Sequence, residues 1–281
     1  MAKRASVAVA VFMLLATAEP ARAVPAAAQA VPASVRAVPA SAVAADLRGT
    51  VALSNCSGAV VRTPAAQPAD PALVLTNGHC VRMMPDGEVL VDRQSSRTFT
   101  LLDGTAAGRL VHADRLLYAT MTRTDAALYR LDVTYADVEA AGSRALELSS
   151  ERPAAGIAID VVSGYWKKVY SCRLDGFVHQ LREDRWTWHD SVRYTRECET
   201  APGSSGSPVL DGAGRVVAVN NTMNESGERC TFNNPCEVDA SGAVTVHHRT
   251  GYAQQTHQFV ACLKPGSVLD LNAPDCSLPR P

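Results

Sequence analysis

The sequence predicts an all-β protein, either a sandwich or a barrel, and two observations support that prediction. From residue 46 to the C-terminus, short apolar stretches, several of them rich in valine, alternate with breaks of glycine, proline, asparagine or aspartate. This spacing is typical of short strands joined by turns. In addition, Trp186-Thr187-Trp188 has the period of two expected of a strand face. The stretches that we expect to be strands include 58–62, 72–76, 88–92, 157–163, 165–170, 183–192, 216–219 and 243–247.

Two further features organise this region. A polar, proline-containing stretch at 149–156 is the candidate linker, and it divides the region into an N-terminal part, 46–150, and a C-terminal part, 151–281. Near the end of the chain, 254–263 has apolar residues at helical spacing. We therefore expect one short helix at the C-terminal end of an otherwise β-rich protein.

The first 23 residues have the pattern of a signal peptide. Lys3 and Arg4 begin the chain with positive charge, 5–18 is mostly apolar and uncharged, and Ala21-Arg22-Ala23 is a small-x-small cleavage site. The apolar run is shorter than the roughly 20 residues that span a bilayer, so an uncleaved anchor is the weaker alternative. We expect a secreted, extracellular protein with no membrane association after cleavage; the periplasm is the alternative location.

Residues 24–44 consist of three tandem heptads, VPAAAQA, VPASVRA and VPASAVA. A seven-residue period usually indicates a coiled coil, but Pro25, Pro32 and Pro39 exclude a continuous helix. We predict that 24–45 is an extended linker or a propeptide.

Composition excludes several functional classes. The chain has 281 residues, 27 basic and 28 acidic side chains and no basic stripe, which argues against a nucleic-acid partner. Its eight cysteines contain no CxxC pair, which argues against a redox or zinc protein, and export favours disulfides. His247 and His248 are adjacent, so on a strand they would point to opposite faces. We therefore expect no metal.

The first chemical motif is Leu75-Thr76-Asn77-Gly78-His79-Cys80, which follows an apolar strand. A histidine just beyond a strand end can lie at a cleft, and its ordinary pKa of about 6.5 suits a general base near neutral pH. A single histidine is more often an ordinary surface or core residue. His79 is thus a candidate that needs partners.

The second motif is 125–131, in which Asp125 leads into a strand. A carboxylate can orient an imidazole ring and stabilise its cation. An aspartate at a strand start is usually a cap or turn residue, and Asp114 and Asp132 are equally eligible by residue type.

The third motif is Gly203-Ser204-Ser205-Gly206-Ser207-Pro208, followed by a strand-like segment. A serine hydroxyl becomes a good nucleophile when a base removes its proton. Glycine at 203 allows the amides of Gly203 and Ser205 to point at one oxygen, as in an oxyanion hole. A simple Gly/Ser turn between strands is the alternative.

Chain order narrows the choice among serine hydrolases. The α/β-hydrolases need GxSxG and the order Ser, acid, His, whereas this chain has Ser207 at the last glycine position and runs His79, Asp125, Ser205. That order is the one found in the chymotrypsin fold.

On these motifs, residues 46–281 resemble the chymotrypsin-fold, trypsin-like serine endopeptidases. LTNGHC matches the family's histidine motif, TDAALYRL its aspartate strand, and PGSSGSPVL its nucleophile loop. The resemblance implies His79 as general base, Asp125 as its orienting acid, Ser205 as nucleophile, and Gly203 with Ser205 as the oxyanion hole. It also implies two six-stranded antiparallel β-barrels with the cleft between them. Ser207 resembles the bacterial branch that includes the glutamyl endopeptidases.

The resemblance also implies a bridge between Cys56 and Cys80. We further expect Cys172–Cys198, which would tie the nucleophile loop to an earlier strand, together with Cys230–Cys236 and Cys262–Cys276. Eight cysteines allow 105 connectivities, so the last three pairs stay open at this point.

Two departures from the family concern activation and specificity. Ser204 stands where the animal enzymes carry an aspartate that pairs with the new N-terminal amine, so we expect that switch to be absent. Glu199 lies six residues before Ser205, where trypsin carries an acid that selects basic side chains. Thr200 matches the glutamyl endopeptidases, but Asn220 falls where they place a histidine. Glu199, Thr200 and Asn220 are therefore the candidate substrate-binding residues, without a prediction of glutamate preference.

The resulting hypothesis is a secreted, monomeric serine endopeptidase that acts on polypeptides through an acyl-enzyme and requires no cofactor. The competing hypotheses are a catalytically silent homologue that binds protein through the same cleft and an adhesion module displayed by the heptad tether. Silent homologues usually lose a member of the His-Asp-Ser triad, and here His79, Asp125 and Ser205 are all present.

Overall fold

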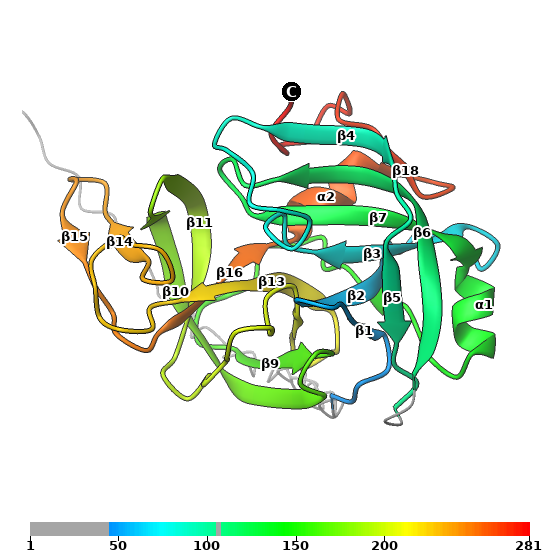
Figure 1. The fold of residues 1–281 in the computed structure, drawn as a ribbon, viewed down its shortest axis with the longest axis horizontal. Helices are drawn as coiled ribbons and strands as arrows, with labels where there is room; N and C mark the ends of the chain where they lie inside the picture. The colour runs from blue at the N-terminus through cyan, green and yellow to red at the C-terminus, as the bar shows by residue number, and fades with distance from the viewer. Residues whose placement is uncertain (1–44, 105–107) are drawn as a thin grey trace, which may run out of the picture. The chain divides into compact units, whose positions relative to one another are not determined.

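The computed structural model describes residues 45–104 and 108–281. The expected signal peptide, and all but the last residue of the heptad segment, lie outside the described residues and stay predictions. Two mainly antiparallel sheets contain most of the regular structure (Figure 1). In the part of the chain that the structure describes, no helix is long and apolar enough to cross a membrane.

The first sheet closes into a six-stranded barrel. Its pairings run β1-β5-β6-β7-β3-β2, and β2 pairs back with β1; β4 pairs with β6 outside this ring, and β8 lies parallel to β2. The strands are β1 (Thr50–Ala52), β2 (Ser57–Arg62), β3 (Pro71–Thr76), β4 (Val89–Gln94), β5 (Thr98–Leu101), β6 (Arg109–Thr120), β7 (Ala126–Thr134) and β8 (Leu146–Glu147).

The second sheet has the same kind of closure. Its pairings run β11-β16-β13-β12-β9-β10, and β10 pairs back with β11, while β14 and β15 extend the sheet beyond β10. The strands are β9 (Ala158–Ser163), β10 (Lys168–Glu183), β11 (Trp186–Tyr194), β12 (Pro208–Leu210), β13 (Val216–Met223), β14 (Cys236–Val238), β15 (Val244–Thr245) and β16 (Gly251–Gln255).

Four short elements complete the described structure. Helix α1 (Tyr135–Ala140) follows β7 and begins with a capping box between Thr134 and Asp137. Helix α2 (His257–Cys262) is followed by a two-stranded sheet of β17 (Leu263–Lys264) and β18 (Val268–Leu269).

The all-β prediction and the chymotrypsin-like fold are confirmed, with local corrections. The predicted helix at 254–263 was too long: Gln254 and Gln255 belong to β16, where they pair with β13, so α2 begins at His257. The strand expected at 165–170 begins at Lys168, because the preceding residues form the β9–β10 turn. The chain passes between the sheets after β8, and the boundary at 150/151 stays a prediction.

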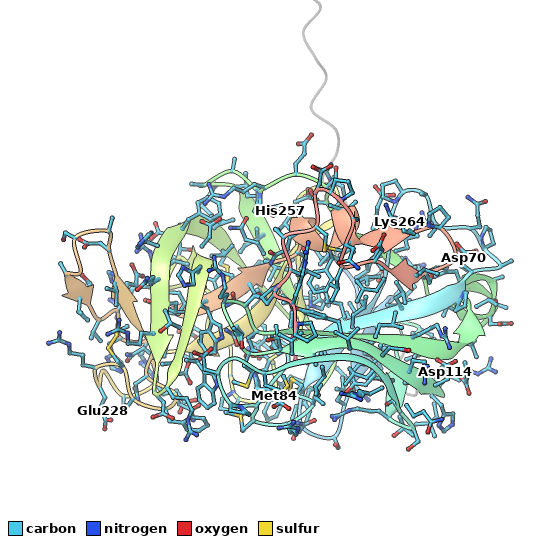
Figure 2. All side chains as sticks on the ribbon, turned by 90° about the horizontal axis from the view of Figure 1, so that it is seen from above. Asp70, Met84, Asp114, Glu228, His257 and Lys264 are labelled. Carbon is cyan, nitrogen blue, oxygen red and sulfur yellow. A yellow bond between two sulfur atoms is a disulfide. The ribbon has the colours of Figure 1, made fainter. Side chains whose placement is uncertain are left out.

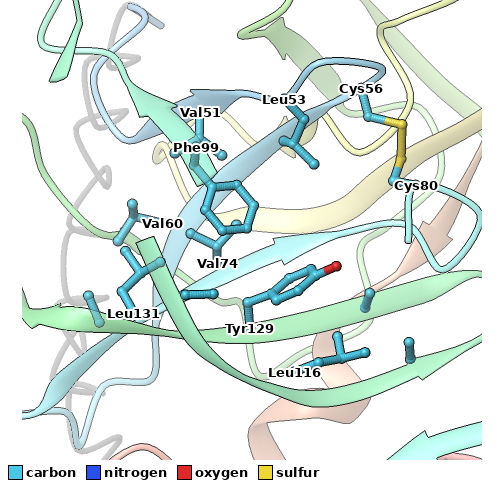
Figure 3. Packing of buried hydrophobic residues seen from close by; sticks show 14 of the residues in the cluster. Val51, Leu53, Cys56, Val60, Val74, Cys80, Phe99, Leu116, Tyr129 and Leu131 are labelled. Atoms are coloured by element: carbon cyan, nitrogen blue, oxygen red, sulfur yellow. A yellow bond between two sulfur atoms is a disulfide. The ribbon is translucent and has the colours of Figure 1, made fainter. Parts of the chain in front are cut away.

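The largest apolar cluster fills the first barrel and extends into the second. Val60, Val74, Phe99 and Tyr129 are buried in its centre, and the rings of Phe99 and Tyr129 meet edge to face at 5.3 Å (Figure 3). Strand alternation places these side chains on the inner face of the sheet.

Two tryptophans of β11 connect the barrels. Trp186 and Trp188 are buried in the cluster of the first barrel. The Trp186 indole N–H donates to the Met84 carbonyl at 2.8 Å, and that of Trp188 donates to the Met121 carbonyl at 3.0 Å. Figure 2 shows Met84 in the region where the two sheets meet. These bonds satisfy the two polar atoms that the aromatic contact would otherwise bury unpaired.

The structure contains the four disulfides that the sequence analysis paired: Cys56–Cys80, Cys172–Cys198, Cys230–Cys236 and Cys262–Cys276. The sequence separations of the paired cysteines range from 6 to 26 residues. Cys56–Cys80 joins the start of β2 to the turn after β3, which is the turn that carries His79.

We predict that Trp188→Ala lowers the free energy of unfolding by about 3–5 kcal/mol, because it removes a buried aromatic and leaves a cavity between the barrels. Denaturant unfolding checks this value. Leu110→Ala is the matched control, since Leu110 is 57% exposed and its loss should cost less than about 0.5 kcal/mol. Equal costs for the two variants would contradict the shared core.

Candidate active site

One cleft contains all three candidate catalytic residues. His79 and Asp125 reach it from the first barrel, and Ser205 reaches it from the second. Glu183, Trp188 and the segment 200–204 also line it. The structure therefore brings together the three motifs that are far apart in the sequence.

The turn after β3 positions His79. Gly78 is required there, because a Cβ at that position would lie 2.0 Å from the Thr120 carbonyl oxygen. Asn77 donates through Nδ2 to the Asp125 carbonyl at 2.8 Å. These two contacts, together with the Cys56–Cys80 disulfide, fix the turn against the first barrel.

Asp125 makes a two-point contact with His79. Its Oδ2 lies 2.7 Å from His79 Nδ1, and its Oδ1 accepts the His79 backbone N–H at 3.0 Å. The carboxylate is fully buried, whereas 22% of the His79 side chain is exposed. Asp114 and Asp132, the other eligible acids, are exposed, and Asp114 pairs with Arg130. The structure thus selects Asp125 as the partner of His79.

The pKa of His79 is raised above its usual value. Burial of the ring is the largest single influence and lowers the pKa, but the Asp125 charge, the Asp125 hydrogen bond and the Glu183 charge together outweigh it. The Asp125 carboxylate therefore stabilises the imidazolium in this cleft.

Ser205 lies in the loop before β12. Its Oγ–H donates to the Asn221 carbonyl at 3.1 Å, and among the described residues no hydrogen bond joins it to His79. Catalytic hydrogen bonds are often loose in structures without substrate, and rotation about χ1 redirects a serine hydroxyl. The loop approaches β2 closely, because Gly206 has φ of +83° and a Cβ there would lie 2.0 Å from the Ser57 carbonyl oxygen.

The backbone around Ser205 presents two free donors. Gly203 has φ of +92°. Within the described residues, neither the Gly203 N–H nor the Ser205 N–H has a hydrogen-bond acceptor. Two unpaired N–H groups beside a serine hydroxyl can stabilise an anionic oxygen.

The candidate specificity residues separate into two groups. Thr200 and Asn220 are buried and line the cleft, where Asn220 Nδ2 donates to the Ser204 carbonyl at 3.0 Å. Glu199 is exposed and does not line the cleft. It follows Cys198, whose disulfide to Cys172 ties that backbone to β10. Glu199 is thus not placed in this cleft, and a role for it in specificity stays a prediction.

Besides Asp125 and the exposed Glu225, the cleft is lined by Glu183, a buried acid that the sequence did not single out. It is buried at the end of β10, where its carboxylate accepts from Thr222 Oγ1 at 2.6 Å and from the Asn233 N–H at 2.9 Å. Burial raises the pKa of Glu183 and outweighs these hydrogen bonds. A signal was available: Leu181 and Glu183 share the buried face of the strand, and an acid on that face is unusual.

One group of candidate metal ligands occurs among the described residues, namely Cys56, His79 and Cys80. Both cysteines are in the disulfide, and His79 Nδ1 is bonded to Asp125. This group does not fit a metal ion, because a coordinating cysteine must be a free thiolate.

The family model of the trypsin-like peptidase domain matches residues 56–219. This chain belongs to that family. The matched segment contains all three candidate catalytic residues. No curated protein sequence matches the chain.

Solved structures show weaker similarity. The HtrA-type protease AlgW, solved with a decapeptide, is 18% identical with a TM-score of 0.45; the match covers 72% of this chain and 48% of AlgW, about half of its length. The MamO protease domain from Magnetospirillum magneticum is 14% identical with a TM-score of 0.48, covering 78% of this chain and 97% of that domain. The Rv3671c protease from M. tuberculosis, in its active form, is 15% identical with a TM-score of 0.45, covering 75% of this chain and 77% of that one.

We predict that Asp125→Asn lowers the pKa of His79, because it removes the charge that stabilises the imidazolium. Glu183→Gln should lower that pKa by a smaller amount. NMR titration of the His79 ring protons measures both shifts. Asp114→Asn is the matched control and should leave the titration unchanged, since Asp114 is exposed and paired with Arg130. An unchanged His79 titration in Asp125→Asn would contradict the pairing.

Proposed function

We propose that this protein is a secreted serine endopeptidase that hydrolyses peptide bonds in polypeptides. The observation that carries the proposal is the arrangement in the cleft: a His79–Asp125 pair, the Ser205 hydroxyl, and two unpaired backbone N–H groups in the same loop. Membership of the trypsin-like peptidase domain family supports the reaction class.

The proposed reaction gives a role to each of these groups. His79 accepts the Ser205 proton as Oγ attacks the substrate carbonyl, and the N–H groups of Gly203 and Ser205 bind the resulting oxyanion. Asp125 holds the ring in the tautomer whose Nε2 accepts the proton. His79 then protonates the leaving amine, and a water molecule activated by the same ring hydrolyses the acyl-enzyme.

Four disulfides support export, because such bonds persist in oxidising compartments. The signal peptide at 1–23, the monomeric state and the similarity to the bacterial branch with the glutamyl endopeptidases are further parts of the proposal. The alternative, a silent homologue that binds protein in this cleft, draws on the bond of Ser205 Oγ to Asn221 instead of His79.

A fluorophosphonate probe distinguishes the two functions. We expect a covalent adduct on Ser205, mapped by mass spectrometry of the folded protein. Peptidase activity should fall by about 10⁵- to 10⁶-fold in Ser205→Ala and in His79→Ala, because the triad acts as a unit. Folded protein without an adduct on Ser205 would favour the silent homologue.

The pH dependence of kcat/KM gives a second prediction. His79 must be neutral to accept the serine proton, and its pKa is raised, so activity should increase with pH along a limb centred above about 6.5. Initial rates across the pH range from 5 to 9 test this. A limb centred below 6 would contradict the role of Asp125 as an ionised partner of His79.

A further inference from the structure

The two unpaired N–H groups belong to residues 201–205, which we call the oxyanion loop. Contacts of this loop must hold the two N–H groups in their orientation. Ser204 stands where the animal enzymes carry an aspartate, so a charge pair with a chain terminus does not fix this loop. The structure shows that each of its five carbonyl oxygens accepts a hydrogen bond.

Three of these carbonyls are held from within the second barrel or by the backbone of β2. The Ala201 oxygen accepts from Ser204 Oγ at 2.6 Å, and the Ser204 oxygen accepts from Asn220 Nδ2 at 3.0 Å. The Ser205 oxygen accepts the N–H of Ser57 at 2.7 Å.

The other two carbonyls are held by side chains of the β9–β10 turn and of β2. The Trp166 indole N–H, from the β9–β10 turn, donates to the Pro202 oxygen at 2.8 Å. The Ser57 hydroxyl donates to the Gly203 oxygen at 3.1 Å. Ser57 Oγ in turn accepts the backbone N–H of Tyr165 at 3.1 Å, so β2 and the β9–β10 turn are tied together beside the loop.

Peptide geometry connects these bonds to the oxyanion donors. A trans peptide unit is planar, with its C=O and the next N–H pointing in opposite directions. The Pro202 carbonyl and the Gly203 N–H belong to one such unit, and the Ser204 carbonyl and the Ser205 N–H belong to another. Holding the first unit by Trp166 and the second by Asn220 therefore fixes the direction of both donors.

The 202–203 peptide unit depends most on such a hydrogen bond. Glycine adopts positive φ without steric cost, so a rotation of the 202–203 peptide is opposed by little else in the backbone. The Tyr165 ring lies against Gly203, where a Cβ would be 2.8 Å from it, and packs edge to face on Trp166 at 5.1 Å. Trp166 itself is 51% exposed, so core packing does not account for its position.

We propose that Trp166 is a positioning residue for catalysis: its indole N–H holds the 202–203 peptide so that the Gly203 N–H faces the oxyanion. The inference rests on the proposed function. It identifies an internal hydrogen bond, in place of a charge pair formed on activation, as the element that keeps the loop competent.

Trp166→Phe tests the inference, because phenylalanine keeps an aromatic ring and loses the donor. We expect kcat on a peptide substrate to fall about tenfold, with KM within twofold. This decrease lies between the effect of losing one neutral hydrogen bond and the effect of losing an oxyanion donor. The affinity for a peptide aldehyde, whose adduct with Ser205 carries the oxyanion, should fall by the same factor. The melting temperature should change little.

Tyr118→Phe is the matched control. It removes an aromatic donor to another proline-residue carbonyl, that of Pro279, at 3.0 Å and outside the cleft. Its kcat and aldehyde affinity should equal those of the wild type. Unchanged kcat in Trp166→Phe, or a change in KM alone, would overturn the positioning role while leaving the proposed function intact. An inactive wild-type protein would overturn both.

Discussion

The close approach of Gly206 to strand β2 is the contact on which the cleft depends. A single Cβ at this position would lie 2.0 Å from the Ser57 carbonyl oxygen and 2.2 Å from Thr76 Oγ1. Without a side chain there, the nucleophile loop of the second barrel lies directly on the first barrel. Ser205 thereby comes into the cleft that also contains His79, just beyond the end of β3.

The same contact connects the two chemical halves of the site. Thr76 Oγ1 donates to the Ser57 oxygen at 2.7 Å, and the Ser57 N–H donates to the Ser205 oxygen. The β3 strand that carries the histidine turn is thus bonded through β2 to the nucleophile. Trp186 and Trp188 connect the barrels on another part of the interface, where burial of their large aromatic surfaces stabilises the contact. Both the catalytic geometry and the stability of the protein therefore depend on the interface between the two barrels.

Much of this could be predicted from the sequence. The alternation of Trp186-Thr187-Trp188 identified a strand, and the order of His79, Asp125 and Ser205 selected one fold among the serine hydrolases. The rest depended on tertiary contacts that no local pattern contains. Glu199 and Glu183 are both glutamates near apolar strands, and only the pairing of β10 with β11 and the Cys172–Cys198 disulfide decide which one lines the cleft. Asp125 and Asp114 were equally eligible by residue type, and burial and the contact with His79 distinguish them in the structure. The hydrogen bond from Trp166 to Pro202 joins segments 36 residues apart.

In the proposed reaction, Ser205 attacks a carbonyl whose oxygen is then bound by the Gly203 and Ser205 N–H groups. A crystal structure of the fluorophosphonate adduct tests both parts of this step. We expect a covalent bond from Ser205 Oγ to phosphorus, with the phosphoryl oxygen about 2.7–3.1 Å from both backbone nitrogens. A phosphoryl oxygen directed away from these two groups, or an adduct on another residue, would contradict it.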